Sequence, residues 1–154
     1  MRGGKYSAFE AGTRVPFIVQ WPAKIKAGTV SEALFSQVDL YASLAALTGQ
    51  KITDGNAPDS FNNLNALLGA KTGRKYVVEQ SLSNTLGIVQ GNWKYIEPSN
   101  GRKISQNTNI ELGNDLQPQL YNLKEDIGER NNLAEKHPEK VKELAEKLRK
   151  IKEG

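Results

Sequence analysis

The sequence contains no cysteine and a single histidine, His137, among its 154 residues. The absence of cysteine excludes disulfide bonds, thiolate catalysis and cysteine-ligated metal sites. One histidine is too few for a multi-histidine metal centre, and it gives no firm basis for a Ser-His-Asp triad. Because His137 directly precedes Pro138, we expect it at the beginning of a helix. The chain is therefore poor in catalytic side chains.

Long apolar runs and a strong excess of one charge are also missing. No run approaches the ~20 apolar residues that a membrane helix needs, so we expect no membrane span. The net charge is only +4. Much of the positive excess falls within 140–152, where lysines alternate with glutamates, which favours a solvated helix over a nucleic-acid-binding face. Residues 1–15 do not have the pattern of a secretory signal.

The first half of the chain predicts one buried strand and one buried helix. Residues 15–22, VPFIVQWP, are apolar on both alternating faces, which is typical of a strand in a parallel sheet with flanking helices. Such a strand needs neighbours on both edges, and the rest of the chain does not clearly supply them. Residues 36–49 predict a helix that is apolar around most of its circumference, with Ser36 and Asp39 resembling a capping box. A short helical turn is expected at 64–69.

The second half predicts a small antiparallel sheet and a final helix. Gly91 and Asn92 separate two extended runs and indicate a hairpin turn. A helix is predicted over 138–152, with an apolar stripe that packs on the strands. The fold class is therefore α/β, with an α+β arrangement in this chain, and we divide it into regions 1–70 and 71–154. The expected strands are 75–81, 86–90, 93–98 and 118–123.

Five segments, taken in order and spacing, resemble the C-terminal part of an arylsulfatase-type sulfatase of the alkaline-phosphatase superfamily. The resemblance implies that 1–70 is the end of the main α/β domain and that 71–154 forms a small C-terminal subdomain. The segments are GGKYSAFEAGTRVPFIVQWP (3–22), SQVDLYASLAALTGQ (36–50), DSFNNLNALLG (59–69), GIVQGNWKYI (87–96) and QLYNLKEDIGERNNLAEKHPEKVKEL (119–144).

Sulfatases of this type hydrolyse sulfate esters with a formylglycine, made from the Cys or Ser of a Cys/Ser-x-Pro-x-Arg motif, and with a calcium ion held by Asp and Asn. This chain contains no such motif, and the family's metal ligands and catalytic histidine lie upstream of the matching region. The resemblance thus implies that the chain alone is inactive and holds no cofactor. Its partners would be the missing N-terminal part of the same enzyme and a sulfated substrate. The parent enzyme is expected to be periplasmic or secreted.

The resemblance also implies roles for individual residues. Lys5 occupies the position of the family lysine that reaches the sulfate group, so it is the catalytic and substrate-binding candidate. An ammonium is a compact cation that can bind a sulfate oxygen and offset charge on the ester oxygen. Gln80 and Ser81 are candidate substrate contacts at the rim of the pocket, although an ordinary strand end explains them equally well. Glu10 and Arg14 are expected to form a structural ion pair.

Two other functions are compatible with the residues. The chain could be a non-catalytic α+β module that packs on or binds a partner, because it lacks a nucleophile. It could also be the tail of a related phosphonate or phosphodiester hydrolase. If the chain is the C-terminal part of a sulfatase, we expect the isolated chain to self-associate, since residues 15–22 and 37–48 present apolar faces that upstream sequence should cover.

Overall fold

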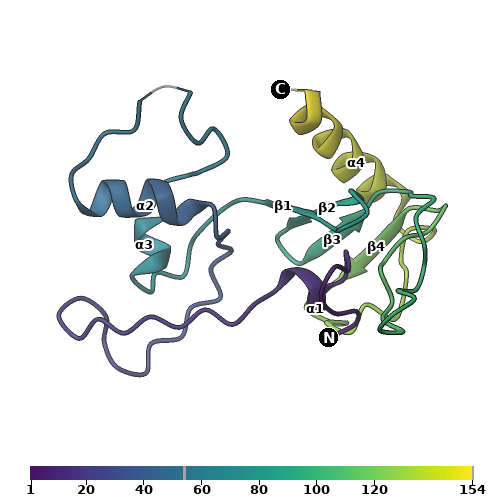
Figure 1. Ribbon diagram of the computed structural model, residues 1–154, viewed down its shortest axis with the longest axis horizontal. Coiled ribbons are helices and arrows are strands. Elements are labelled where there is room, and N and C mark those ends of the chain that lie inside the picture. Colours follow the sequence, from purple (N-terminus) through teal and green to yellow (C-terminus); the bar gives the residue numbers. More distant parts are fainter. Residues whose placement is uncertain (54, 154) are drawn as a thin grey trace. The chain divides into compact units, whose positions relative to one another are not determined.

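The computed structural model describes residues 1–53 and 55–153. The chain forms two compact units, of which unit 1 contains residues 1–16 together with those from 78 onward and unit 2 contains residues 17–77 (Figure 1). The predicted regions 1–70 and 71–154 refer to a longer protein and stay predictions, and residue 154 lies outside the described residues. Among the described helices, none combines the length and apolarity needed to cross a membrane.

Unit 1 is built on a four-stranded sheet in the order β1-β2-β3-β4. The β2–β3 and β3–β4 pairs are antiparallel. Gly91 in the β2–β3 turn has a φ of +58°, the left-handed conformation that a tight hairpin turn requires. The predicted sheet is therefore confirmed. Its strands are β1 (Val77–Gln80), β2 (Leu86–Gln90), β3 (Trp93–Ile96) and β4 (Gln119–Asn122).

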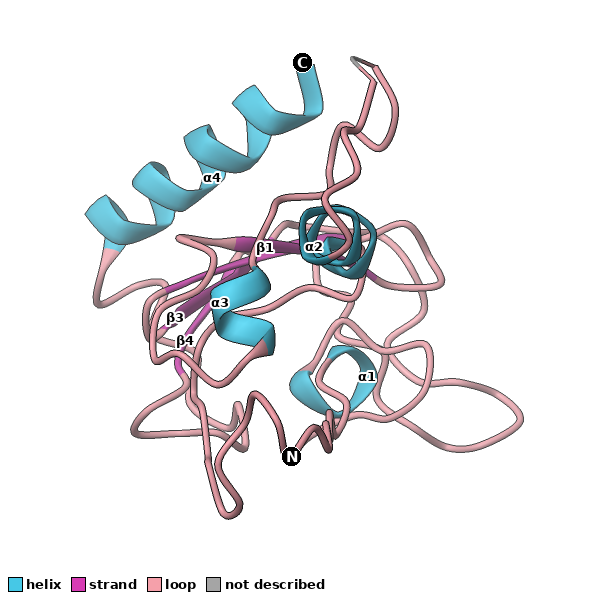
Figure 2. Ribbon diagram, turned by 90° about the vertical axis from the view of Figure 1, so that its left-hand side faces the viewer, coloured by secondary structure: helices cyan, strands magenta, loops and turns pink. Residues whose placement is uncertain are grey.

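The final helix, α4 (Pro138–Glu153), covers one face of this sheet (Figure 2). Its apolar stripe is buried at Leu144 and Leu148, as the sequence predicts. Ile88 and Tyr95 are cross-strand partners in β2 and β3, so they share a face. Tyr95 and Leu148 line the same small cleft, which identifies that face as the one under α4.

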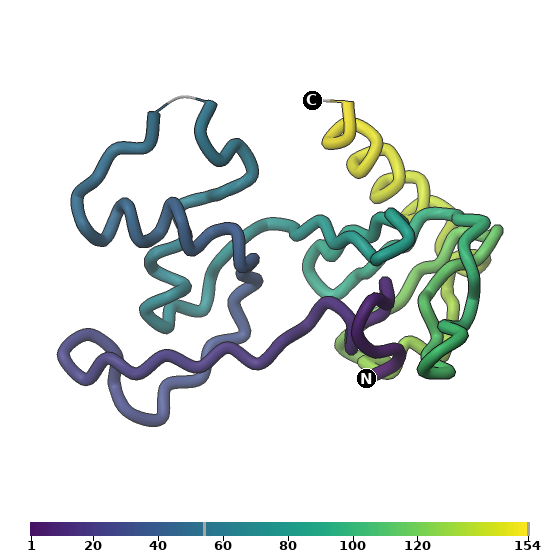
Figure 3. Tube along the Cα trace, in the orientation of Figure 1, coloured from purple at the N-terminus to yellow at the C-terminus, as the bar shows by residue number. Residues whose placement is uncertain are grey.

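The first 16 residues cover the opposite face. They run beside the loops that precede β4 (Figure 3), and the Ala8 N–H donates to the Leu112 carbonyl over 2.9 Å. The Phe9 ring meets the Tyr121 ring edge-on, with centroids 6.1 Å apart. In α1 (Glu10–Thr13), a Cβ on Gly12 would lie 2.2 Å from the Ser7 carbonyl oxygen, so only glycine fits there. The sheet is thus enclosed from both sides.

The described residues of unit 2 form two helices, α2 (Asp39–Leu47) and α3 (Leu64–Leu67). The Ser36 N–H donates to Asp39 Oδ2 over 3.2 Å, which is one half of the predicted capping box. The helix α2 is not buried all round, because Tyr41 is 55% exposed and Leu44 is 48% exposed. In this chain, α2 is therefore covered on one side.

The predicted buried strand at 15–22 is wrong for this chain. These residues carry no strand pairing within the described part of the structure. They are also exposed, since Ile18 is 90% accessible and Phe17 is 54% accessible. The physical reason is that none of the described strands pairs with these residues, and an extended segment cannot be buried in a sheet without ladder partners.

Candidate functional site

Lys5 lies in a tight turn at the surface of unit 1. The Ser7 N–H donates to the Gly4 carbonyl over 2.9 Å, so Lys5 and Tyr6 are the two central residues. Tyr6 has a φ of +82°, a conformation that normally calls for glycine. Holding a tyrosine there costs on the order of 1–3 kcal/mol, and strain of this kind gathers at functional sites. The Lys5 ammonium is exposed and lies 4.9 Å from the centre of the Tyr6 ring.

The other two predicted substrate contacts lie close to this turn in the fold. The Leu82 N–H donates to the Tyr6 carbonyl over 3.2 Å, which joins the Lys5 turn to the end of β1. Gln80 is exposed and donates to the Asn84 side chain over 2.8 Å. The structure thus joins the Lys5 turn to the turn that follows β1, and both Lys5 and Gln80, the last residue of β1, have accessible side chains.

Ser81 lies in the same turn, but its hydroxyl is occupied. Ser81 is buried, and its Oγ accepts the Thr85 N–H over 3.2 Å and contacts the Ser83 Oγ over 3.0 Å. The Ser83 and Thr85 hydroxyls both donate to Asn114 Oδ1, and these hydrogen bonds stabilise the turn. Substrate contact by Lys5, Gln80 or Ser81 stays a prediction, and Ser81 has the clearest structural role of the three.

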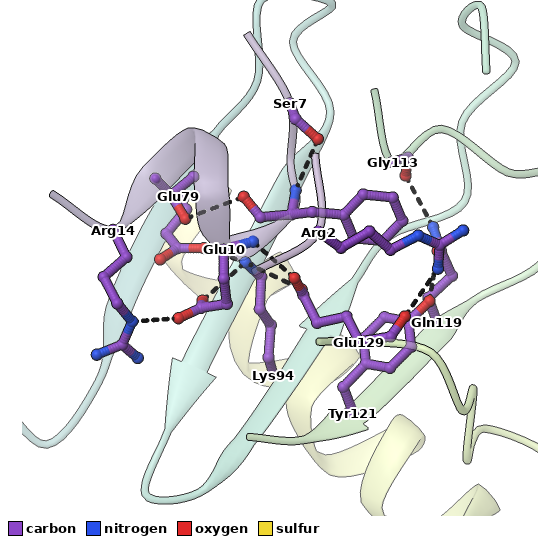
Figure 4. A network of polar contacts seen from close by, with 12 residues as sticks. Arg2, Ser7, Glu10, Arg14, Glu79, Lys94, Gly113, Gln119, Tyr121 and Glu129 are labelled. Carbon is purple, nitrogen blue, oxygen red and sulfur yellow. Dashed lines mark hydrogen bonds and ion pairs between the residues drawn. The ribbon is translucent and has the colours of Figure 1, made fainter. Parts of the chain in front are cut away.

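A buried charge cluster includes Glu10 of α1, the helix that follows the Lys5 turn in the sequence (Figure 4). Lys94 is fully buried in β3, and its Nζ lies 3.0 Å from Glu10 Oε1, 3.0 Å from Glu79 Oε2 and 3.4 Å from Glu129 Oε1. The Arg14 Nε donates to Glu10 Oε2 over 2.5 Å, which confirms the predicted ion pair. The cluster joins α1, β1, β3 and the loop after β4.

Three members of this cluster, Lys94, Glu79 and Glu129, were not predicted from the sequence in that role. Lys94 occupies the inward-facing position of a strand, between Trp93 and Tyr95. A lysine is rarely buried without a partner, so a charged residue at such a position was the available indication of a buried ion pair. Glu79 shares a segment with two residues interpreted as a pocket rim, yet its side chain faces Lys94. Glu129 follows a glycine in a turn, and no pattern in the sequence distinguishes it from an exposed acid.

Burial and charge compete within the cluster. Burial acts to lower the pKa of Lys94, but the three carboxylates outweigh it, so that pKa lies above its ordinary value. Burial acts to raise the pKa of Glu10, but Lys94 and Arg14 outweigh it and leave that pKa below its ordinary value. For Glu129, burial prevails over the attraction of Lys94 and raises the pKa to about 7. Three carboxylates thus face two cations, which favours one retained proton.

The described residues do not fit the cofactors that the resemblance implies. No group of three His, Asp or Glu side chains in residues 1–53 and 55–153 could hold a metal ion. The one dense set of carboxylates encloses Lys94, whose ammonium occupies the space that a cation would need. The formylglycine motif is absent from the sequence. What unit 1 offers chemically is an accessible ammonium on Lys5, carried by a turn whose backbone is hydrogen-bonded.

Comparison with protein families and curated proteins gives a consistent result. A family model described as Sulfatase matches residues 1–50. An N-acetylgalactosamine-6-O-sulfatase of Bacteroides thetaiotaomicron is 58% identical over 152 residues, which cover 98% of this chain and 30% of the relative. The chain therefore spans about a third of the length of the relatives that match it along most of its own sequence.

Solved structures agree with this comparison. A Bacteroides thetaiotaomicron protein from work on the metabolism of multiple glycosaminoglycans matches with a TM-score of 0.96 and 57% identity, over 99% of this chain and 32% of its own. A sulfatase from a Pseudoalteromonas species matches with a TM-score of 0.77 and 21% identity, over 97% of this chain and 32% of its own. The second match shows the shared fold alone.

Proposed function

This chain belongs to the sulfatase family and corresponds to the C-terminal part of a sulfatase, and we propose that it supplies one active-site residue, Lys5, to an enzyme that hydrolyses sulfate esters. The observation that carries the proposal is the Lys5 turn. It presents an ammonium to solvent on a backbone that is strained at Tyr6 and fixed by hydrogen bonds on both sides. An ammonium held in this way stabilises negative charge on a transferring sulfuryl group without further reorganisation.

The substrate we propose is the 6-O-sulfate ester of an N-acetylated amino sugar. The support is the 58% identity to a relative described as an N-acetylgalactosamine-6-O-sulfatase. Gln80 is the further substrate contact, because its amide is exposed beside the Lys5 turn. Ser81 contributes by shaping the turn that follows β1, where its hydroxyl is engaged by Thr85 and Ser83.

The complete enzyme requires groups that this chain does not contain. We assign the formylglycine and the calcium ion to an N-terminal part of the same protein, which is the chain's main partner. The exposed apolar side chains of 15–22 are the surface that this part covers. Without it, the isolated chain self-associates through the same surface. We place the complete enzyme in the periplasm or outside the cell, a proposal that fractionation of the source cells tests.

Activity of the isolated chain provides the first test. The purified 154-residue chain, incubated with calcium and a 6-sulfated N-acetylgalactosamine, should release no sulfate above a heat-treated control, because nucleophile and metal ligands are absent. Clear turnover would contradict the assignment of this chain to the C-terminal part of the enzyme.

A chimera provides the sharper test. This chain replaces the matching 152-residue region of the Bacteroides relative, and sulfate release is measured. The chimera should be active, and Lys5→Ala should lower its turnover by about 10²–10³-fold, the usual effect of removing one donor aimed at developing charge. Lys5→Arg should rescue only in part, because a planar fork places its donors differently.

Lys136→Ala is the matched control, because Lys136 is equally exposed in unit 1 and lies in a different turn. It should leave turnover unchanged. Normal turnover of the Lys5→Ala chimera would remove the active-site role of this chain. An inactive but folded wild-type chimera would show that this chain cannot replace the relative's C-terminal part.

A further inference from the structure

We propose that Glu129 is a positioning residue for Lys5, because it clamps the segment that carries Lys5 on both of its flanks. This inference rests on the proposed role of Lys5. It assigns to a buried acid, 124 residues further along the sequence from Lys5, the task of fixing where the ammonium lies. Glu129 itself touches no substrate, since its side chain is fully buried.

The clamp consists of two hydrogen bonds from one residue. The Glu129 Oε2 accepts the Glu10 N–H over 2.7 Å, on the C-terminal side of Lys5. The Glu129 carbonyl accepts the Arg2 guanidinium over 2.7 Å, on the N-terminal side. The side chain and the main chain of a single residue therefore hold both ends of the stretch 2–10.

Lys94 completes the clamp from the interior of the sheet. Its Nζ lies 3.0 Å from Glu10 Oε1 and 3.4 Å from Glu129 Oε1, so Lys94, Glu10 and Glu129 form a closed triangle. All three side chains are at most 1% exposed. Contacts between charged groups that are shielded from water are stronger and less variable than those at the surface, which suits a fixed support.

The loop around Glu129 is built to turn this side chain inward. The Asp126 carboxylate accepts the N–H groups of Arg130 and Asn131 over 2.7 and 2.8 Å, which fixes the turn. Glu129 has a φ of +49°, although its neighbour Gly128 is the residue that adopts such conformations without cost. The strained position thus falls on the residue whose side chain makes the clamp.

A held ammonium differs from a free one in its effect on rate. The Lys5 side chain is long and exposed, so the position of its backbone limits where the charge can be placed. A displacement of about 1 Å at a reacting centre can cost about 10²-fold in rate. Loosening either flank of 2–10 should therefore lower turnover through Lys5.

A double-mutant cycle in the active chimera tests the proposal. Glu129→Ala should lower kcat by about 10–100-fold when Lys5 is present. In the Lys5→Ala background, the same change should lower kcat by less than about twofold, since no ammonium is left to misplace. Glu129→Gln should restore turnover in the first background, because its amide oxygen can accept the Glu10 N–H. Glu135→Ala, at an exposed acid of the same unit, is the control.

A second variant covers the case in which Glu129→Ala does not fold. Arg2→Met removes the N-terminal half of the clamp and leaves the buried triangle intact, whereas Glu111→Gln weakens only the ion pair between Arg2 and Glu111. We expect Arg2→Met to lower kcat only when Lys5 is present, and not in the Lys5→Ala chimera. Glu111→Gln should have a smaller effect on kcat.

Three results would overturn the proposal. Equal losses from the clamp variants with and without Lys5 would mean that they act on stability. Failure of Glu129→Gln to restore turnover would remove the hydrogen-bond mechanism. Normal turnover of both Glu129→Ala and Arg2→Met, beside an impaired Lys5→Ala, would refute the clamp and leave the proposed function standing. If Lys5→Ala alone has normal turnover, the proposed function fails first.

Discussion

Units 1 and 2 are stabilised by different kinds of interaction. Unit 1 encloses a sheet between α4 on one face and residues 1–16 on the other, and its core side chains are almost fully buried. In unit 2 the described buried residues are Asp39, Ala42 and Ser43, which contribute little apolar area. Apolar burial is therefore the main stabilising contribution in unit 1, whereas unit 2 depends on polar contacts.

In unit 2, hydrogen bonds to the buried Asp39 carboxylate take the place of an apolar core. Its carboxylate accepts hydrogen bonds from the Arg74 guanidinium over 2.7 and 2.5 Å, from the Phe61 N–H over 3.0 Å and from the Asn63 amide over 2.9 Å. Burial acts to raise the pKa of Asp39, but these donors outweigh it and keep that pKa below its ordinary value. One ionised side chain thus links α2, the loop before α3 and the segment after it.

The largest expected effect is the loss of Lys94. Lys94→Met leaves three buried carboxylates facing one another without their ammonium, so we expect unit 1 to lose about 5 kcal/mol of unfolding free energy. The fluorescence of Trp93 during chemical denaturation, in a Trp21→Phe background, reports this loss. Lys142→Met, at an exposed position of α4, is the control. An unchanged midpoint would show that the cluster does not support the sheet.

The matching change in unit 2 is Asp39→Ala. It leaves Arg74, whose side chain is 7% exposed, without its carboxylate partner, and we expect a loss of about 3 kcal/mol. Amide hydrogen exchange should then speed up throughout α2 while the amides of β2 and β3 keep their protection. Glu32→Ala, at an exposed acid of the same unit, should change neither. Loss of amide protection in both units together would contradict the expectation that the two units open separately.

The pH dependence of unit 1 is expected to be smaller and to have a definite sign. Because the pKa of Glu129 is raised from 4.5 to about 7, the folded state binds this proton more tightly than the unfolded state. Stability should therefore fall as the pH rises from about 4.5 to about 7 and level off above, by on the order of 2–3 kcal/mol. Glu129→Gln should flatten this part of the curve, measured by denaturation at each pH.

The opposite trend at lower pH is expected from Glu10, whose pKa is depressed. Its contribution is present above its ordinary pKa of 4.5 and is lost as the pH falls through the folded value. A wild-type curve that rises steadily between pH 5 and 7 would contradict the retained proton on Glu129.

The smallest expected effect on folding concerns the exposed apolar surface. Ile18→Lys should change stability by less than about 0.5 kcal/mol, since Ile18 is 90% exposed. It should nevertheless reduce self-association in sedimentation velocity experiments, because it places a charge in the apolar surface. Leu116→Lys, at a residue of unit 1 that is 71% exposed, should leave association unchanged. A wild-type chain that stays monomeric at every concentration would refute this role of residues 15–22.

Local patterns predicted unit 1 well. The strand at 86–90, the turn at Gly91 and the helix that begins at Pro138 depend on neighbouring residues, and the structure has them where the sequence places them. The strand expected at 15–22 failed because none of the described strands pairs with these residues. The ion pair of Glu10 with Arg14 was also predicted, and its two residues are four positions apart.

The rest of the site depends on contacts that no local pattern records. Lys94 meets Glu10 from 84 residues away, and Glu129 meets Glu10 from 119 residues away. Lys5 was identified through family resemblance. The strained turn at Tyr6 could be recognised only from the structure, because the sequence has a tyrosine where a turn of this type usually has glycine.

The contact between Arg2 and Glu129 has a consequence for the timing of folding on the ribosome. The two residues are separated by 127 positions, and at roughly 5–20 residues per second Glu129 is made roughly 6–25 s after Arg2. Until then, residues 2–10 lack the two hydrogen bonds that Glu129 accepts. A chain that ends before Glu129 would carry Lys5 without this clamp, so synthesis as far as Glu129 is itself a condition for a fully held Lys5 segment.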